Sequence, residues 1–185
     1  MRIAVSGTHC SGKSTLVNEF LTARPDFVYE PEPYSVLVED YGEEFSAEPC
    51  VDDFLRQLEF NIERLRQRAS GERVIFERCP LDFIAYILAL RDLHREEVEP
   101  QTIANARELA MAALHCLDLI VFLPLDEANM IAVPADEDPK LRKAVDRQLV
   151  AIFGDDEFEL PSVEARGSTA QRLRILEGKM KPQDN

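Results

Sequence analysis

Residues 7–14 read GTHCSGKS, and this stretch decides the fold that the sequence predicts. It fits the pattern G-x-x-x-x-G-K-[S/T], in which glycines let the backbone curl so that successive N–H groups point at phosphate oxygens. A short β-branched run at residues 2–6 precedes it, and residues 13–23 follow with apolar side chains at helical spacing. This order of strand, loop and helix predicts a phosphate-binding loop and disfavours a plain strand-to-helix turn.

Outward from this loop, apolar runs that indicate strands alternate with segments of helical periodicity. Strands are expected at residues 2–6, 26–29, 73–76, 119–123 and 158–165. Helices are expected at residues 13–23, 34–41, 51–69, 81–93, 101–115, 139–153 and 169–176. Strands buried on both faces are continuous apolar runs, so the pattern predicts an α/β fold with a doubly wound, three-layer parallel sheet of about five strands. We expect one domain over residues 1–178 and a C-terminal tail at 179–185.

Composition narrows the class of partner. The chain has 185 residues, with 35 acidic against 21 basic side chains and a formal net charge of −14. This charge disfavours nucleic acid or an anionic membrane as a partner. No apolar run has the length of a membrane span, and the amino end does not resemble a signal peptide, so a cytoplasmic location is expected. The four cysteines are scattered, which favours free thiols in a reducing compartment.

The loop and the helix after it supply specific ligands for a nucleotide. The Lys13 ammonium reaches the β- and γ-phosphates, the Ser14 hydroxyl binds Mg²⁺, and the Thr15 hydroxyl bonds the α-phosphate. The helix that starts near Lys13 adds the positive end of its dipole. The residues of this segment expected to bind the nucleotide are Gly7, Thr8, His9, Cys10, Ser11, Gly12, Lys13, Ser14 and Thr15.

Acidic residues follow the second and third predicted strands. Glu30 comes after the strand at 26–29, and Glu77 and Arg78 come after the strand at 73–76. Ligands of parallel sheets bind beyond the carboxyl ends of the strands, so these side chains are expected near the γ-phosphate. Glu30 suits the base that orients the attacking oxygen, Glu77 suits metal support through bound water, and Arg78 suits charge neutralisation. An ordinary loop acid at Glu30 and a surface ion pair at Glu77 and Arg78 are the alternatives.

The P-loop, a Glu-Pro after the second strand and a Glu-Arg after the third together resemble the P-loop small-molecule kinases, in particular the deoxynucleoside-kinase pattern. The layout is also similar to the nicotinamide-riboside-kinase-like ATP-binding domains. The resemblance implies a sheet order of 2-3-1-4-5, ATP and Mg²⁺ as cofactors, and Glu30 as the base for the substrate hydroxyl. Glu32-Pro33 offers a second register for the Glu-Pro motif. Cys79 stands where a serine commonly follows Glu-Arg, which leaves the substrate contacts open.

The resemblance also implies two flanking segments. A lid is expected around residues 126–147, with Arg142 first and Lys143 second as the side chains that close on the phosphates. A solvated helix face, with Arg142 beside Asp146, accounts for these residues equally well. Gly167 and Ser168 are expected to edge the adenine, and Ser168 or Thr169 is also expected as a helix N-cap; both roles are compatible.

The sequence therefore predicts an ATP- and Mg²⁺-dependent kinase that transfers a phosphoryl group to a hydroxyl of a small metabolite, with a nucleoside or ribosyl compound favoured. The expected catalytic residues are Lys13, Glu30, Arg78 and Arg142, and the expected metal ligands are Ser14 and Glu77. The alternatives are a regulatory ATPase or GTPase switch, or a nucleotide-binding protein without an acceptor. The acceptor, the preference for ATP over GTP and the oligomeric state stay open.

Overall fold

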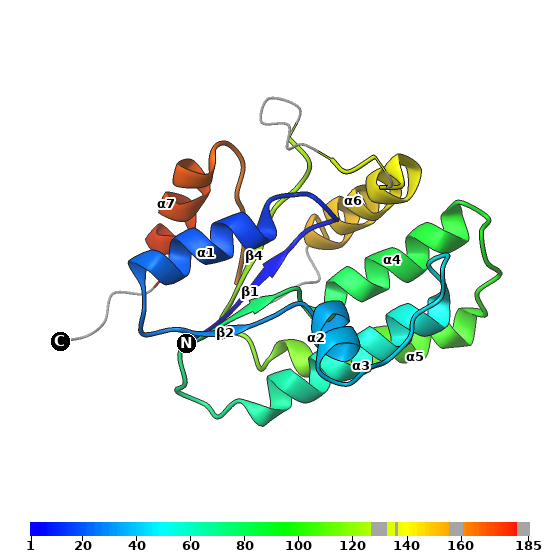
Figure 1. Ribbon diagram of the computed structural model, residues 1–185, viewed down its shortest axis with the longest axis horizontal. Helices are drawn as coiled ribbons and strands as arrows, with labels where there is room; N and C mark the ends of the chain where they lie inside the picture. The colour runs from blue at the N-terminus through cyan, green and yellow to red at the C-terminus, as the bar shows by residue number, and fades with distance from the viewer. Residues whose placement is uncertain (127–132, 136, 156–160, 181–185) are drawn as a thin grey trace.

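The computed structural model of the chain describes residues 1–126, 133–135, 137–155 and 161–180. Five strands form one parallel sheet in the order β2-β3-β1-β4-β5, which confirms the predicted fold class and strand order (Figure 1). The strands are β1 (Arg2–Ser6), β2 (Val28–Glu30), β3 (Val74–Glu77), β4 (Leu119–Phe122) and β5 (Ser162–Glu164). The helices are α1 (Lys13–Ala23), α2 (Pro33–Glu39), α3 (Val51–Gln67), α4 (Pro80–Asp92), α5 (Pro100–Leu114), α6 (Pro139–Phe153) and α7 (Thr169–Lys179).

Several element ends differ from the prediction. Strand β2 is shifted toward the carboxyl end and includes Glu30, because Glu30 pairs with Phe76 of β3. Helix α7 continues to Lys179 and so takes in the start of the expected tail. Strand β5 covers Ser162–Glu164, and the expected strand residues 158–160 lie outside the described part of the chain. Intrinsic sequence patterns locate such elements better than they locate their ends.

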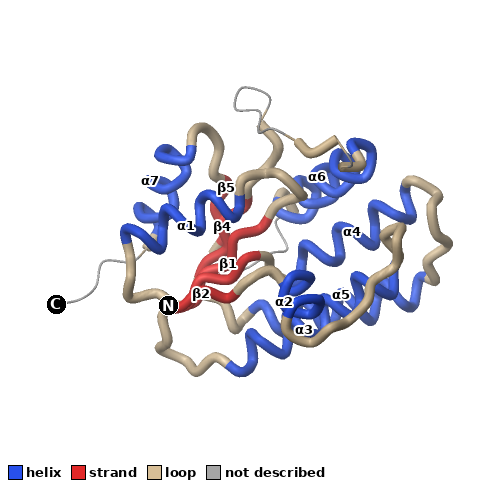
Figure 2. Tube along the Cα trace, in the orientation of Figure 1, coloured by secondary structure: helices blue, strands red, loops and turns tan. Residues whose placement is uncertain are grey.

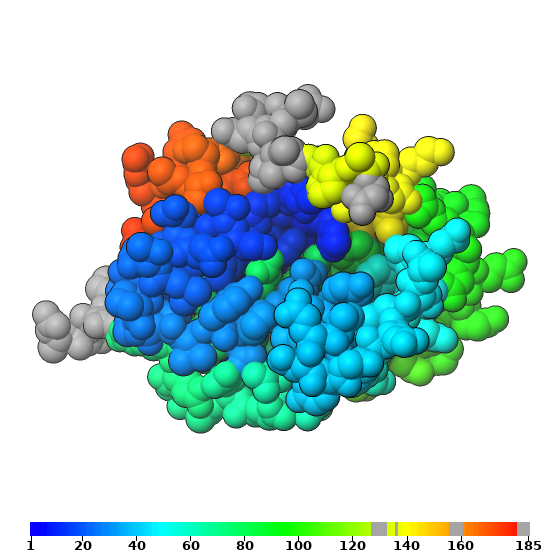
Figure 3. Space-filling view, viewed as in Figure 1, coloured from blue at the N-terminus to red at the C-terminus, as the bar shows by residue number. Residues whose placement is uncertain are grey.

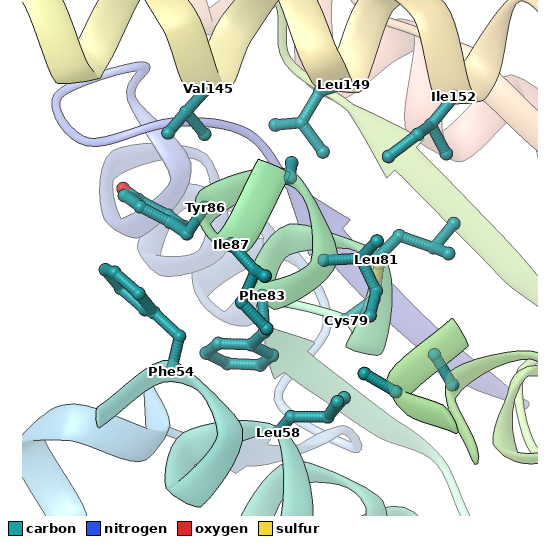
Figure 4. Close-up of a cluster of buried hydrophobic side chains, with 14 of the residues drawn as sticks. Phe54, Leu58, Cys79, Leu81, Phe83, Tyr86, Ile87, Val145, Leu149 and Ile152 are labelled. Carbon is teal, nitrogen blue, oxygen red and sulfur yellow. The ribbon is translucent and has the colours of Figure 1, made fainter. Parts of the chain in front are cut away.

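The helices cover both faces of the sheet (Figure 2). Helices α1 and α7 pack on one face over a cluster that includes Leu16, Phe20 and Leu176. Helices α3, α4, α5 and α6 lie on the other face, where α4 is buried between its neighbours. Figure 4 shows this second cluster, with Phe54 of α3 and Leu149 of α6 reaching α4 from opposite sides. Burial of α4 on nearly all sides explains why its sequence is apolar all round.

Two further expectations concern the chain as a whole. Within the described ranges, no helix combines the length and the apolar character that crossing a membrane requires. All four cysteines are free thiols, as the scattered spacing predicted.

Parallel pairing brings the loops that follow the central strands to one edge of the sheet. Val5 of β1 lies opposite Glu77 of β3, so the segments after these strands leave the sheet side by side. Glu30 ends β2 next to β3 at the same edge. The fold thereby gathers the phosphate loop and the acidic strand ends, as the topology rule predicts.

Candidate active site

The loop between β1 and α1 has the backbone of a phosphate cradle. Cys10 and Gly12 adopt left-handed conformations, with φ of 51° and 95°. Position 7 requires a glycine because a Cβ there would lie only 2.7 Å from the Leu123 carbonyl oxygen. None of the described side chains caps the first turn of α1, and that turn contains no acidic residue. The N–H groups at the start of α1 are therefore available to an anion.

The loop carbonyl oxygens from residue 7 to residue 11 all accept hydrogen bonds from cationic side chains. In a trans peptide the carbonyl and the following N–H point in opposite directions, so carbonyls held outward turn N–H groups into the cradle. The donors come from four separate places in the chain. The pairs are Arg78 with Gly7 O, Lys13 with Thr8 O, Arg142 with His9 O and Cys10 O, and Arg172 with Ser11 O.

Lys13 lies inside the loop, where its ammonium donates to Thr8 O at 2.9 Å. Burial, followed by the nearby positive charge of Arg78, lowers the pKa of Lys13 to about 8. The carboxylates of Glu32, Asp82 and Glu77 act in the opposite direction. A bound phosphate would favour the charged ammonium, so the binding of an anion here would be expected to take up a proton near pH 8.

Two oxygen donors meet at the mouth of the loop. The Ser14 hydroxyl donates to Glu77 Oε1 at 2.6 Å, and the Tyr29 hydroxyl donates to Glu77 Oε2 at 2.8 Å. Mg²⁺ is bound in nucleotide sites by one or two protein oxygens together with phosphates and water. The Ser14 and Glu77 oxygens fit that requirement. The described residues form no cluster of three or more His, Cys, Asp or Glu side chains of the kind that holds a metal alone.

Arg78 is nearly fully buried and adopts a left-handed backbone, with φ of 83°. Its guanidinium pairs with Glu32, lies 3.5 Å from Asp82 and sits over the Tyr86 ring at 5.3 Å. Burial alone would lower the pKa of Arg78, but Glu32 and the other partners outweigh it and raise that pKa. Backbone strain at a buried charge is typical of functional sites.

Glu32 is an ionised carboxylate beside the phosphate loop. Burial would raise its pKa, but the charges of Arg78, Lys13 and His9 outweigh burial and lower the pKa to about 2. Glu32 immediately precedes α2 and lies two residues after Glu30, the last residue of β2 and the expected base. Its partners place Glu32 among the side chains that were predicted to bind phosphate.

Glu30 has different partners. Its carboxylate is 3% exposed and accepts hydrogen bonds from Arg64, at 2.9 and 3.0 Å, and from Arg68. Both arginines belong to the end of α3 or follow it directly. Among the contacts of the described residues, none joins Glu30 to the phosphate loop. The structure thus brings Lys13, Ser14, Glu77, Arg78 and Glu32 together and places Glu30 in a separate ion cluster.

Asp82 joins the phosphate loop to the turn after β3, a role that sequence reasoning missed. Asp82 is fully buried, and its two carboxylate oxygens accept from Gly7 N and Cys79 N, each at 2.9 Å. The available signal was an acidic residue within an otherwise apolar helix, where an unpaired charge is costly.

The expected lid is described in part. Residues 127–132 and 136 lie outside the described part of the chain. The Arg142 guanidinium donates to His9 O at 2.9 Å and Cys10 O at 3.0 Å, while the Thr8 hydroxyl donates to Arg142 O. In the space-filling view the start of α6, in yellow, lies against the dark-blue loop (Figure 3). Lys143 is exposed, and Asp146 accepts from Leu125 N.

The remaining predicted nucleotide ligands lie around this centre. Thr15 is exposed on the first turn of α1, and Cys10 is partly exposed. The His9 ring contacts the ring of Tyr86 edge-on, and its Nδ1 lies 3.2 Å from Glu137. Burial, followed by Arg78, lowers the pKa of His9.

The loop before α7 has the features expected of Gly167 and Ser168. Gly167 has a φ of 94°, and a Cβ there would lie 2.4 Å from Gln171 Oε1. Its N–H donates to Asp126 at 3.1 Å. Ser168 caps α7 through a reciprocal pair of bonds with Gln171, so Ser168 rather than Thr169 is the N-cap.

An aromatic stack extends from Arg78 toward α3. The Phe54 ring stacks on Tyr86 at 4.5 Å, with 20° between their planes. Two buried polar side chains of α3, Gln57 and Asn61, are one helical turn apart, and Asn61 Oδ1 is buried without a partner among the described residues. Sequence reasoning did not single out Asn61.

Comparison with known proteins places the chain in a family. A family model described as an AAA domain matches residues 2–172. Among solved structures, a deoxyadenosine kinase from M. mycoides has 16% identity and a TM-score of 0.66, and the match covers 97% of this chain and 98% of that one. A thymidylate kinase from Candida albicans has 21% identity and a TM-score of 0.61, and the match covers 96% and 89%. No curated protein matches significantly. The fold is that of the nucleoside-kinase-like P-loop enzymes, and the chain belongs to this AAA-domain family.

Proposed function

We propose that this protein transfers the γ-phosphoryl group of ATP, with Mg²⁺, to a hydroxyl of a small metabolite, and that the acceptor is a nucleoside or ribosyl compound. The observation that carries the proposal is the ionised Glu32 carboxylate, held by Arg78 beside Lys13 at the mouth of an uncapped phosphate loop. Transfer to a metabolite needs a carboxylate where the acceptor hydroxyl meets the γ-phosphate.

The residues have distinct roles in this reaction. The loop N–H groups and Lys13 bind the β- and γ-phosphates and neutralise charge that develops during transfer. Ser14 and Glu77 would hold Mg²⁺, and the bound ion would help to neutralise the negative charge of the phosphates. Arg142 and Arg172 hold the loop carbonyls outward, and Gly167 with Ser168 would edge the base.

Glu32 is the proposed base in place of Glu30, because Glu30 is held by two arginines of the α3 region. A carboxylate with a pKa of about 2 is a weak base in the free protein. Phosphoryl transfer proceeds through a loose transition state in most analyses, so a strong base is not required to orient the hydroxyl. The negative charge of a bound triphosphate would also offset Lys13 and Arg78, which raises the pKa of Glu32 toward its usual value.

The structural neighbours support a nucleoside-like acceptor. Solved structures of the deoxyadenosine kinase contain dCMP with dCDP in one case and dATP in another. At these identities the likeness concerns the fold, so the substrate class is our proposal for this chain. The net charge of −14 supports a small-molecule partner over nucleic acid or an anionic membrane, and we place the reaction in the cytoplasm.

A panel assay tests the function. The purified chain is incubated with ATP, Mg²⁺ and single nucleosides or ribosyl vitamins, while ADP release and the phosphorylated product are measured by a coupled assay and by mass spectrometry. We expect at least one acceptor to raise ADP release well above the rate without acceptor, and Lys13→Met to abolish that rise. ATP hydrolysis that no acceptor stimulates would favour a regulatory ATPase, and nucleotide binding without turnover would favour a binding protein.

A further inference from the structure

We propose that Arg172 is a positioning residue that holds the phosphate loop in its binding conformation and couples it to the loop before α7. The proposal rests on the proposed nucleotide binding, and its test separates the two. It starts from a contact between segments 161 residues apart, in which Arg172 Nη1 donates to Ser11 O at 2.6 Å within the protein interior.

The placement of Arg172 is costly by several physical criteria. The residue is only 4% exposed, and its Nε is buried without a partner among the described residues. Arg172 is also the fourth residue of α7, where the positive end of the helix dipole disfavours a cation. Burial lowers the pKa of Arg172, against the opposing charge of Asp126. A leucine or methionine would pack here at less cost, so stability alone does not account for an arginine.

The contact with Ser11 O gives Arg172 an effect on phosphate binding. The Ser11 carbonyl and the Gly12 N–H belong to one trans peptide and point in opposite directions. When Arg172 holds the carbonyl outward, the Gly12 N–H is turned toward the cradle, at the residue where the chain reverses into α1 with a φ of 95°. Arg142 makes the equivalent contacts one and two residues earlier, so the last peptide of the loop depends on Arg172.

The backbone of Arg172 is held by the loop proposed to edge the base. Its N–H donates to Ser168 O at 2.9 Å, and the neighbouring Gly167 N–H donates to Asp126. A ligand that packs on residues 166–168 therefore also immobilises the start of α7 and the Arg172 side chain. This gives a physical route by which the base end of a nucleotide strengthens binding at its phosphate end.

Binding measurements with partial ligands test the proposal. Isothermal titration is performed with MgATP, inorganic tripolyphosphate and adenosine, on the wild type and on Arg172→Met, Arg172→Gln and Arg172→Lys. Arg174→Met is the matched control, because Arg174 is exposed on the same helix. We expect Arg172→Met to weaken ATP and tripolyphosphate by about tenfold each, as for loss of a charge-assisted hydrogen bond, with adenosine changed less than about twofold. Arg172→Lys should recover part of the loss, and Arg174→Met should bind as the wild type does.

The loop conformation is read independently of any ligand. The chain contains seven glycines, so glycine-selective ¹⁵N labelling gives a spectrum simple enough to assign Gly12. We expect the Gly12 amide signal to move in Arg172→Met and in Arg172→Gln, and to stay in Arg174→Met. Arg172→Gln keeps a donor and much of the volume, so it supplies the measurement if Arg172→Met does not fold.

Each possible result of these binding and NMR measurements supports or overturns the proposed role of Arg172. Loss of ATP binding with unchanged tripolyphosphate binding would make Arg172 a contact of the base and overturn the proposal. Equal losses in Arg172→Lys and Arg172→Met, or an unmoved Gly12 signal, would overturn it as well. If the wild type binds neither ATP nor tripolyphosphate, the proposed function fails, while the Gly12 signal still decides whether Arg172 positions the loop.

Discussion

Replacing Glu32 and Glu30 separately, each by glutamine, tests the central assignment of the site. The two carboxylates are two residues apart in the chain but have separate partners, Arg78 for Glu32 and Arg64 with Arg68 for Glu30. We expect Glu32→Gln to abolish turnover while leaving nucleotide binding intact. We expect Glu30→Gln to lower stability while leaving turnover nearly unchanged.

The magnitudes follow from the surroundings. Loss of a general base costs about 10²- to 10⁴-fold in kcat. Removing the Glu32 charge also removes a carboxylate near Lys13, so ATP should bind Glu32→Gln at least as tightly as it binds the wild type. The pKa of Glu32 is lowered from 4.5 to about 2, which corresponds to at most about 3 kcal/mol of folding free energy at neutral pH.

The pH dependence of stability tests the direction in which the pKa of Glu32 is shifted by folding. A carboxyl group whose pKa is lower in the folded state stabilises the fold above its unfolded pKa and loses that contribution as the pH falls through its folded pKa. The unfolding free energies of the wild type and Glu32→Gln should therefore differ most above pH 4.5 and converge toward pH 2. Denaturant titration across this range measures the difference.

The assays are steady-state kinetics at 15 °C, titration calorimetry and thermal unfolding, applied to both variants. For Glu30→Gln we expect kcat within about threefold of the wild type and a loss of about 1–3 kcal/mol, because two partly exposed arginines lose a buried partner. That loss lowers the melting temperature by about 2–12 °C in a chain of this size. A Glu32→Gln variant with normal kcat, or a Glu30→Gln variant that folds normally but does not turn over, would refute the assignment.

Three further predictions follow from the site. Because the pKa of Lys13 is lowered to about 8, ATP affinity should fall as the pH rises through 8, and ATP binding should take up a proton near that pH. Calorimetry in buffers of different ionisation enthalpy detects the proton uptake. A constant ATP affinity from pH 7 to 9.5 would contradict the prediction. Tyr29→Phe removes one hydrogen-bond donor to Glu77, so the Mn²⁺ concentration needed for tight ATP binding should rise about three- to tenfold. ATP binding without metal should stay unchanged. An equal effect on ATP binding without metal would argue against a role of Tyr29 in metal binding. Gly167→Ala should cost about 1–2 kcal/mol in denaturant unfolding, because φ is 94° and the new Cβ meets Gln171. Gly178→Ala is the control: Gly178 lies within α7 with open space around it, so this variant should be at least as stable as the wild type.

The sequence was sufficient for the sheet and the phosphate loop because local patterns encode them. The run at residues 2–6, the loop glycines and the apolar spacing of α1 each depend on neighbours in the chain, and these predictions are confirmed. The order of the strands came from the family resemblance. Strand ends were less certain, as Glu30 shows, because pairing with Phe76 and not local composition makes it part of β2.

The choice between Glu30 and Glu32 depended on contacts that sequence does not display. The α3 arginines that bind Glu30 lie more than thirty residues away, and only the packing of α3 brings them near. Arg172 was missed for the same reason, since nothing in its neighbours indicates a contact with Ser11. Long-range ion pairs are set by tertiary packing, so the sequence indicated which charged side chains belong to the site but not which of them contact one another.

The hydrogen bonds of the Asp82 carboxylate link the motion of two loops. Its oxygens satisfy the amides of Gly7 and Cys79, which leave two adjacent strands, in a region that excludes solvent. Separating these amides would leave a buried charge with half of its bonds, at a cost of several kcal/mol. The first turn after β1 and the first turn after β3 must then move as one rigid unit.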